Sequence, residues 1–350
     1  MVHNAMLMRL QRDIPLAPMT TLGVGGPAKY FVHATGVDDI REAVEWAATN
    51  GEPLLVLAGG SNVVISDEGF NGIVLHVDLR GINVESEDRH SVVVNVAAGE
   101  PWDGFVAMAV RNGWAGVECL SGIPGTAGAT PIQNVGAYGQ EVRETIVRVE
   151  TLDRATGRTR WMTNAECGFG YRTSVFKGAS KGRAIVLSVT FRLTPGGAPA
   201  ARYPELQRVA GQAVSLQQMR DAVIAIRRGK GMVIDPADPD TRSDGSFFMN
   251  PIVPPETLAR LPDMPHFPAG DQVKLSAAWL IEHAGFQKGF THGKAGTSSK
   301  HTLAIINRGG ATAREVLELA RMIQGRVHQK FGIELQPEPD FIGFGCSPDR

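Results

Sequence analysis

Apolar side chains recur at every third or fourth position in several stretches of the chain. This spacing places them on one face of a helix, and it predicts helices at 38–50, 102–113, 215–228, 274–285 and 311–332. The first helix is expected to begin at Asp38, because aspartate is favoured at the N-cap of a helix. These helices therefore carry one apolar face each and should pack against other elements.

Short, continuous apolar runs predict buried strands between these helices. They lie at 54–57, 73–79, 91–99, 147–153, 184–193 and 302–307, and a further strand at 158–163 should pair with 147–153 across the turn DRATG. Strands dominate the first half of the chain, and helices alternate with strands in the second half. The pattern indicates the α+β class, with a domain boundary near 195–215.

Composition and charge narrow the class of protein. A chain of 350 residues is long enough for two or three domains. Lys plus Arg number 35 and Asp plus Glu number 36, which does not suggest a nucleic-acid-binding surface. No apolar run approaches the roughly 18 residues of a membrane span, and the N-terminal residues lack the core of a signal peptide. We therefore expect a soluble protein without membrane insertion.

The cysteines give a second indication of location. Cys119, Cys167 and Cys346 are scattered and show no C-x-x-C spacing. This distribution does not fit a disulfide framework or a zinc site, and it is compatible with the reducing cytoplasm. We expect a cytoplasmic protein without a bound metal.

Three familiar signatures match in letters but not in context. GASKG (178–182) fits the nucleophile elbow of hydrolases, but the predicted strand follows it instead of preceding it. GFTHGKA (289–295) is one residue too short for a phosphate-binding loop and ends in alanine where a magnesium-binding hydroxyl is required. GVGGPA (23–28) neither fits G-x-G-x-x-G nor follows a predicted strand, so a Rossmann dinucleotide site is unsupported.

Two glycine-rich segments are better candidates for ligand binding. LAGGSN (57–62) follows a buried strand, and its backbone N–H groups could bind an anion with help from Ser61 and Asn62; a plain turn is the alternative. GIPGTAGATPIQNVGAYG (122–139) is too rich in glycine for a regular helix or strand. Long loops of this kind inside a compact domain are usually functional. Together the two segments favour a dinucleotide without saying which one.

Five motifs in this order resemble the UDP-N-acetylenolpyruvoylglucosamine reductase (MurB) family. They are AGGSN, GIPGTAGATPIQNVGAYGQE, CGFGYRTSVFK (167–177), GSFFMNP (245–251) and QPEPDFIG (336–343), and the resemblance covers about residues 17 to 344. It implies FAD-binding domains of the vanillyl-alcohol-oxidase (PCMH) type and a smaller α+β substrate-binding domain. The implied division is 1–80 with 333–350 returning to it, 81–214, and 215–332. Ser61 stands in the first glycine turn, which offers no histidine, so FAD is expected to bind without a covalent link.

The resemblance also implies the roles of individual residues. The catalytic residues would be Ser246 as proton donor, Arg172 and Glu338. The FAD-binding residues would be Gly59, Gly60, Ser61, Asn62, Gly122, Pro124, Gly125, Gly128, Thr130, Gln133, Asn134, Gly136 and Ala137. The substrate or the nicotinamide cofactor would be held by Tyr138, Tyr203, Lys230 and Asn250. The chain departs from familiar relatives at Asp340, Thr291 and Met249.

The implied reaction is the NADPH-dependent reduction of an enolpyruvyl UDP-sugar to UDP-N-acetylmuramate, a step in peptidoglycan synthesis, by a monomer. Arg172 would grip the carboxylate and Ser246 would deliver a proton to carbon. We expect Gly245 to let the backbone approach the flavin, and Phe247 and Phe248 to form a strand that aims the Ser246 hydroxyl. The alternatives are another FAD-dependent oxidase or dehydrogenase of the same fold, and a nucleotide-sugar-binding protein without activity.

Overall fold

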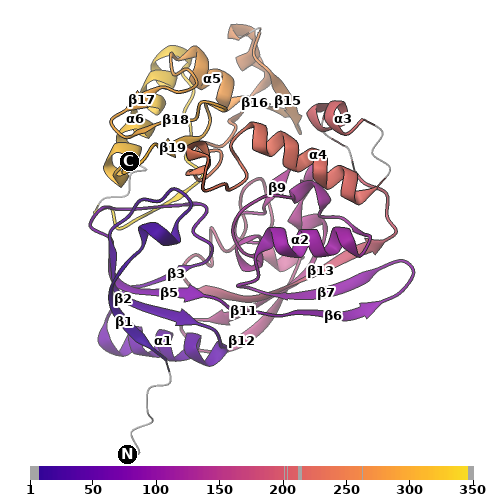
Figure 1. The fold of residues 1–350 in the computed structure, drawn as a ribbon, viewed down its shortest axis with the longest axis vertical. Helices are drawn as coiled ribbons and strands as arrows, with labels where there is room; N and C mark the ends of the chain where they lie inside the picture. Colours follow the sequence, from indigo (N-terminus) through magenta and orange to yellow (C-terminus); the bar gives the residue numbers. More distant parts are fainter. Residues whose placement is uncertain (1–7, 201, 203, 212–214, 262, 346–350) are drawn as a thin grey trace, which may run out of the picture. The chain divides into compact units, whose positions relative to one another are not determined.

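The computed structural model describes residues 8–200, 202, 204–211, 215–261 and 263–345. The chain forms two compact units, coloured along the sequence in Figure 1. The first unit comprises Met1–Ile14, Ala28–Gly60 and Phe70–Arg228, and the second comprises Pro15–Pro27, Ser61–Gly69 and Gly229–Arg350. The division into three domains that the resemblance implies remains a prediction.

The first sheet of the first unit has four strands and one covering helix. The strand order is β1 (Leu10–Pro15), β2 (Pro27–Ala34), β5 (Phe70–Val77) and β3 (Leu54–Leu57), and β5 is parallel to both β2 and β3. The helix α1 (Val37–Asn50) lies against this sheet (Figure 1). The expected N-cap at Asp38 is wrong: Gly36 is the N-cap, its N–H donates to the Asp39 carboxylate at 2.9 Å, and Asp38 lies in the first turn.

The second sheet of the first unit is antiparallel. The order is β12 (Thr159–Thr163), β11 (Ile146–Asp153), β13 (Ala184–Pro195), β7 (Val92–Ala97) and β6 (Ile82–Glu87), with β8 (Trp114–Ala115) paired to the end of β13. Alternate side chains of β7 are fully buried, as expected of a strand with one face on the core.

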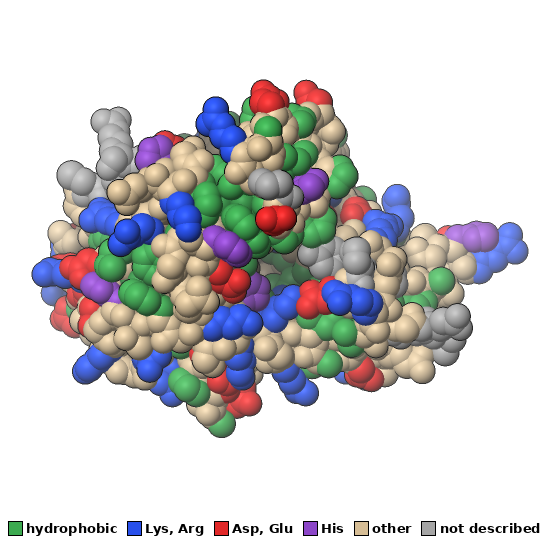
Figure 2. Space-filling model, turned by 90° about the horizontal axis from the view of Figure 1, so that it is seen from above, with side chains coloured by type: hydrophobic (Ala, Val, Ile, Leu, Met, Phe, Trp, Pro, Cys, Tyr) green, Lys and Arg blue, Asp and Glu red, His purple; other side chains and the backbone are tan. Residues whose placement is uncertain are grey.

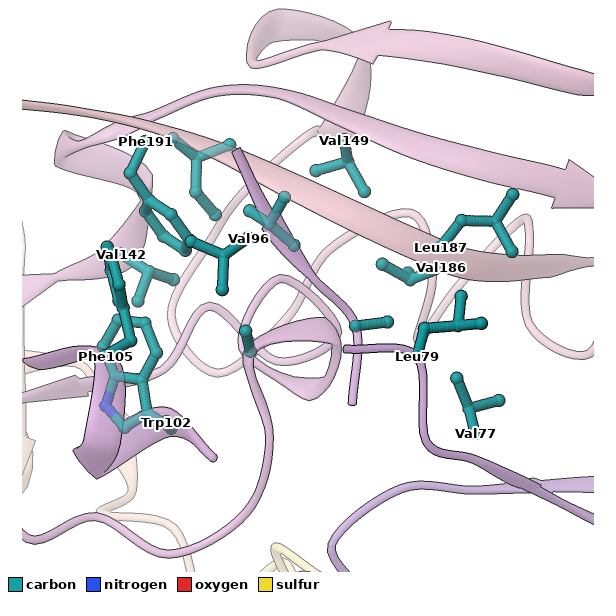
Figure 3. Close-up of a cluster of buried hydrophobic side chains, with 14 of the residues drawn as sticks. Val77, Leu79, Val96, Trp102, Phe105, Val142, Val149, Val186, Leu187 and Phe191 are labelled. Atoms are coloured by element: carbon teal, nitrogen blue, oxygen red, sulfur yellow. The ribbon is translucent and has the colours of Figure 1, made fainter. Parts of the chain in front are cut away.

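Aromatic side chains fill the core beneath the second sheet. Trp102 and Phe105 of α2 (Trp102–Arg111) meet Phe191 of β13, with ring centroids 5.1 to 5.7 Å apart (Figure 3). All three side chains are essentially inaccessible to solvent. The tilted arrangement is the one that aromatic rings prefer, and it fixes α2 against the sheet.

The remaining elements of the first unit follow or interrupt the glycine-rich loop. They are β9 (Gly136–Ala137), β10 (Gln140–Glu141), α3 (Pro204–Ala210) and α4 (Leu216–Gly229). The loop at 119–140, which the sequence left without regular structure, therefore ends in a short antiparallel hairpin. This hairpin carries Tyr138 at its tip.

The second unit combines three small sheets with two helices. The sheets are β14–β16–β15 (Ile252–Val253, Gln272–Leu275, His266–Ala269), β17–β18–β19 (Thr291–His292, Ala295–Thr297, Ile305–Asn307) and the parallel pair β20–β4 (Asp340–Ile342, Val63–Ile65). The helices are α5 (Ala277–His283) and α6 (Ala313–Phe331). The N–H groups of Ala313 and Arg314, at the start of α6, donate to the carboxylate of Asp67. The negative charge of this carboxylate also interacts favourably with the positive end of the helix dipole.

Most predicted elements are confirmed, and two boundaries besides the start of α1 are wrong. The helix expected at 274–285 begins at Ala277, because Lys274 and Leu275 belong to β16 and the Ser276 hydroxyl accepts the Trp279 N–H as an N-cap. The strand expected at 302–307 is reduced to β19. The helix α3 and many of the described strands, among them β1, β2 and β6, were not expected, because these strands are short or are not continuous apolar runs.

The described residues contain neither a membrane-spanning helix nor a metal-binding cluster. None of the described helices combines the length and apolar composition needed to cross a lipid bilayer. Among the residues that the structure describes, no group of three or more His, Cys, Asp and Glu side chains is arranged to hold a metal ion. Basic and acidic side chains are interspersed over the face shown in Figure 2, in keeping with their near-equal numbers.

Candidate functional site

The two glycine-rich segments meet within the first unit. A Cβ atom placed on Gly59 would lie 2.6 Å from the Cα atom of Gly125, so neither backbone leaves room for a side chain on Gly59. Gly60 and Gly125 have φ angles of 59° and 103°, which only glycine adopts readily. The contact explains why both segments are rich in glycine, and it brings two stretches of bare backbone together.

Backbone strain in the first unit is concentrated in the predicted site. Of the four non-glycine residues described with positive φ, three are predicted site residues: Asn134 (48°), Tyr138 (51°) and Arg172 (53°). Such conformations cost on the order of 1–3 kcal/mol each and persist where surrounding contacts impose them. Strain of this kind clusters at functional sites, so its distribution supports the choice of these residues.

The CGFGYRTSVFK segment is held against the second glycine-rich loop. The Arg172 guanidinium donates to the carbonyl of Gly136 at 2.8 Å and lies 5.5 Å from the centre of the Tyr171 ring. The Ser174 hydroxyl donates to the carbonyl of Ile132 at 2.7 Å. Arg172 is half-buried, so a guanidinium of fixed position lines the end of the loop.

Asn134 supports the loop through its side chain. It is fully buried, and its amide nitrogen donates to the Glu141 carboxylate and to the Gly170 carbonyl, both at 2.9 Å. Its amide oxygen accepts the N–H of Arg143 at 3.2 Å. Thr130 is similarly engaged, with its hydroxyl donating to the Ala127 carbonyl. Because the polar side-chain atoms of these two residues bind the chain itself, they would contribute to FAD binding by shaping the loop or through their backbone groups.

A partly buried ion pair that the sequence did not reveal anchors the start of the loop. Arg220 of α4 binds Asp103 of α2 through two hydrogen bonds of 2.6 and 2.8 Å, and Asp103 also accepts the N–H of Gly122. Burial opposes ionisation of Asp103, but the hydrogen bonds from Arg220 and Gly122 outweigh it and lower its pKa. Single charges on separate helices carry no sequence signal for such a pair.

The other predicted catalytic residues, Ser246 and Glu338, lie together in the second unit. The N–H of Glu338 donates to the carbonyl of Phe247 at 2.9 Å, and the N–H of Met249 donates to the carbonyl of Gln336. Phe248 and Pro337 form an isolated antiparallel bridge between these two hydrogen bonds. The segments GSFFMNP and QPEPD are therefore paired along their backbones, and both side chains are half-buried.

The end of the first glycine turn joins this pair. The side-chain amide of Asn62 donates to the carbonyl of Glu338 at 3.1 Å, and the N–H of Asp340 donates to the carbonyl of Asn62 at 3.0 Å. The parallel pairing of β20 with β4 continues the contact. The departure at Asp340 thus lies at the start of a strand that fixes Asn62.

The strand expected at Phe247 and Phe248 is wrong. These residues form a bend with one bridging position. Their two buried rings, with centroids 5.3 Å apart, hold the segment in the core. Gly245 has φ of 73°, and nothing described lies within 4 Å of the Cβ position there. The glycine is required by its backbone conformation, while its approach to a flavin remains a prediction.

The predicted substrate residues are distributed over both units. Tyr138 belongs to the first unit, whereas Lys230 and Asn250 belong to the second. The Asn250 side-chain oxygen accepts the N–H of Ala277 at 3.0 Å, so this residue also caps α5. Tyr203 lies outside the described residues.

Comparison with known proteins decides the family. Residues 28–163 match the model of an FAD binding domain, and residues 236–342 match the model of the UDP-N-acetylenolpyruvoylglucosamine reductase C-terminal domain. The reductase of that name from Thermobifida fusca is 51% identical over 349 residues, covering 95% of this chain and 98% of the relative. The chain belongs to the UDP-N-acetylenolpyruvoylglucosamine reductase family. Its counterpart from Streptomyces coelicolor is 48% identical, over 95% of this chain and 90% of the relative.

A solved structure agrees with this membership. The crystal structure of the reductase (MurB) from Thermus caldophilus matches with a TM-score of 0.67 and 28% identity, covering 96% of this chain and 100% of that chain. The fold class expected from the resemblance, with FAD-binding domains and a further α+β part, is confirmed. The chain is therefore an FAD-dependent reductase of this family.

The first unit fits the cofactor of this reductase family. The Thr126 hydroxyl is buried beside Gly125 and has no hydrogen-bond partner among the described residues. Buried hydroxyl groups are nearly always hydrogen-bonded, so a polar ligand group is the natural partner. The paired glycine turns and Thr126 would hold FAD, which supplies hydride chemistry when bound. The sequence analysis missed Thr126, because a threonine inside a loop has no distinguishing pattern.

Proposed function

We infer that this enzyme reduces the enolpyruvyl group of the UDP-sugar for which its family is named. The product is UDP-N-acetylmuramate, a precursor of peptidoglycan, and NADPH is the hydride donor. Family membership over 95% of the chain carries this inference. The scattered cysteines are compatible with the cytoplasm, where NADPH and the UDP-sugar would be available. The proposed enzyme acts as a monomer.

Arg172 would stabilise the negative charge that develops when hydride reaches the enolpyruvyl group. This charge spreads into the substrate carboxylate, which a guanidinium can bind with two hydrogen bonds. Arg172 is suited to this role because its hydrogen bond to Gly136 and its strained backbone hold the guanidinium in place before substrate binds.

Ser246 would donate the proton to the substrate carbon, and Glu338 would orient or protonate the same region. The backbone bond between Glu338 and Phe247 fixes the spacing of these two positions along paired segments. A serine hydroxyl is a weak acid, so it can donate only to a strongly basic carbon and only when it is well placed. Lys230, Asn250, Tyr138 and Tyr203 would bind the substrate diphosphate and sugar or the nicotinamide cofactor.

Ser246→Ala tests the assignment of the proton donor. Stopped-flow absorbance follows reduction of the flavin by NADPH and its reoxidation by the UDP-sugar as separate steps. We expect near-normal reduction, because no proton from Ser246 is needed there. Reoxidation should fall by roughly 10²–10⁴, the usual contribution of a positioned proton donor, and Ser246→Cys should recover part of the loss.

Ser86→Ala is a matched control, since Ser86 is exposed on β6 of the first unit, and it should leave both steps unchanged. Equal slowing of both steps in Ser246→Ala would mean that Ser246 shapes the flavin site instead of donating the proton. If neither step slowed, Ser246 would have no part in the reaction and Glu338 would be tested next.

A further inference from the structure

A buried carboxyl group lies two residues before Ser246 and has no role in the reaction described above. Asp244 is 8% exposed. One carboxyl oxygen accepts the hydroxyl of Thr21 at 3.1 Å, and the other is buried without a hydrogen-bond partner among the described residues. Burying a carboxyl group with half of its hydrogen bonds unmade is unfavourable, so the arrangement calls for an explanation.

The turn that carries Ser246 is fixed on both sides of Asp244. On the N-terminal side, Ser243 forms a bridge with Ile306, and the N–H of Asn307 donates to the carbonyl of Arg242 at 2.9 Å. On the C-terminal side, the N–H of Phe247 donates to the carbonyl of Leu303 at 2.9 Å. Both anchors therefore belong to one continuous segment, 303–307.

Between these anchors the backbone has a point of freedom at Gly245. Its φ is 73°, and a Cβ there would have no neighbour within 4 Å, so packing does not restrain this residue. The hydrogen bond from the Gly245 N–H to the Ser243 hydroxyl, at 3.2 Å, is one restraint on the turn. The hydrogen bond between Asp244 and Thr21 is the second restraint on the turn, and unlike the first it joins the turn to a distant part of the chain.

Thr21 is itself held firmly. The neighbouring Thr20 hydroxyl donates to the Ala17 carbonyl and accepts the N–H of Gly23, both at 3.1 Å. The side chain of Asn307 donates to the carbonyl of Gly23 at 3.1 Å. Asn307 also donates its backbone N–H to Arg242, so one residue is hydrogen-bonded both to the segment of Thr21 and to the segment of Asp244. Thr21 is therefore held at a fixed distance from the turn.

We propose that Asp244 is a positioning residue for Ser246, and that its neutral carboxyl group holds the Ser243–Ser246 turn against Thr21 so that the Ser246 hydroxyl keeps its place. This inference rests on the proposed role of Ser246 as proton donor. Asp244 acts on the reaction only through Ser246 and does not touch the substrate.

The neutral form is the one that this environment favours. Burial raises the pKa of Asp244 from its ordinary value of 3.8 to about 8, and the hydrogen bond from Thr21 opposes the rise only in part. Arg242 and Arg308, on the segments packed against Asp244, are exposed, and His301 is half-buried; none contributes to the shift. No nearby positive charge therefore compensates an ionised Asp244.

The sign of the pH dependence follows from this shift. The folded pKa lies above the unfolded value, so the contribution of the neutral carboxyl is present at low pH and is lost as pH rises through about 8. Above that point each pH unit lowers the neutral fraction about tenfold. Ionisation would place an uncompensated charge in the turn and displace Ser246.

The test compares Asp244→Asn, Asp244→Ala and Thr21→Val by stopped-flow absorbance between about pH 6 and about pH 9.5. Asparagine mimics the neutral carboxyl, so Asp244→Asn should reoxidise the flavin at the wild-type rate near neutrality and keep that rate at high pH, where the wild type slows. Asp244→Ala and Thr21→Val should slow reoxidation about tenfold or more and leave reduction by NADPH unchanged. Asp271→Asn, at an exposed site, is the matched control and should follow the wild type.

Three outcomes would overturn the proposal. The first is the same loss at high pH in Asp244→Asn as in the wild type. The second is normal reoxidation in both Asp244→Ala and Thr21→Val. The third is that these two variants slow flavin reduction by NADPH as much as they slow reoxidation. Thr21→Val reports on the contact from the other side if Asp244→Ala does not fold. Ser246→Ala is measured alongside. Normal reoxidation in that variant removes the proposed role of Ser246, on which this inference rests, whereas a loss there combined with any of the three outcomes removes the role of Asp244 alone.

Discussion

At the scale of single residues, the site depends on side chains that bind the chain itself. Asn134 uses both atoms of its amide on Glu141, Gly170 and Arg143, and it does so at a φ of 48°. Asparagine tolerates this left-handed conformation better than most residues, because its short polar side chain can bind locally. The role of Asn134 in FAD binding, which the family resemblance implies, stays a prediction, and the structure shows how the residue shapes the loop.

Asn134→Ala should lower the free energy of unfolding by about 2–4 kcal/mol. The change removes three buried hydrogen bonds and puts alanine in a left-handed conformation. Denaturant titration followed by circular dichroism measures the effect, and flavin content should fall with it. Asn112→Ala, which removes one exposed contact to Met108, is the control. A stability equal to that of the wild type would show that the loop does not depend on Asn134.

At the scale of elements, the decisive contact is that between the turn after β3 and the loop after α2. Gly59 approaches the backbone of Gly125 so closely that no side chain fits on Gly59. The contact aligns two stretches of backbone that are distant in sequence. A ligand that needs backbone N–H groups from both stretches can bind only when this contact is intact.

Gly59→Ala should separate the two turns and release FAD. The added methyl group would meet backbone atoms of Gly125 at 2.6 Å, and backbone cannot move aside as the end of a flexible side chain can. The ratio of flavin to protein absorbance in the purified variant measures the loss. Gly325→Ala, in α6 with open space around it, should bind FAD normally and gain up to about 1 kcal/mol of stability. Full flavin content in Gly59→Ala would contradict the role of this contact.

At the scale of the whole molecule, the five motifs separate into two groups. The long glycine loop, CGFGYRTSVFK and the start of AGGSN belong to the first unit, with Arg172. The end of AGGSN, GSFFMNP and QPEPDFIG belong to the second unit, with Ser246 and Glu338. The division between units falls inside AGGSN, between Gly60 and Ser61.

The purified protein should be yellow with FAD held only by non-covalent contacts. Heat or acid should release all of the flavin into solution, because the first glycine turn carries Ser61 and offers no histidine for a covalent attachment. Absorbance of the supernatant and of the precipitated chain measures the distribution. Colour that remained with the precipitate would rule out the non-covalent mode.

The sequence alone determined the long helices, the longer apolar strands and the five motifs. Helical periodicity and short apolar runs reflect burial on one face, so they can be read locally, as in α4, α6 and β13. Glycine-rich segments are also visible, because a backbone that must approach another backbone excludes side chains. These features gave the α+β class, whereas the FAD-binding fold and the predicted site residues came from the resemblance of the five motifs to the family.

Only the tertiary structure decided which distant segments meet. The pairing of Gly59 with Gly125, of Asp103 with Arg220, and of Asp244 with Thr21 depends on where whole elements pack, and no single segment encodes it. The same holds for the start of α5. Lys274 and Leu275 were predicted to be helical, but they pair with neighbouring strands as part of β16. Asp244 reads as an ordinary turn residue in the sequence, because its hydrogen-bond partner Thr21 lies 223 positions away.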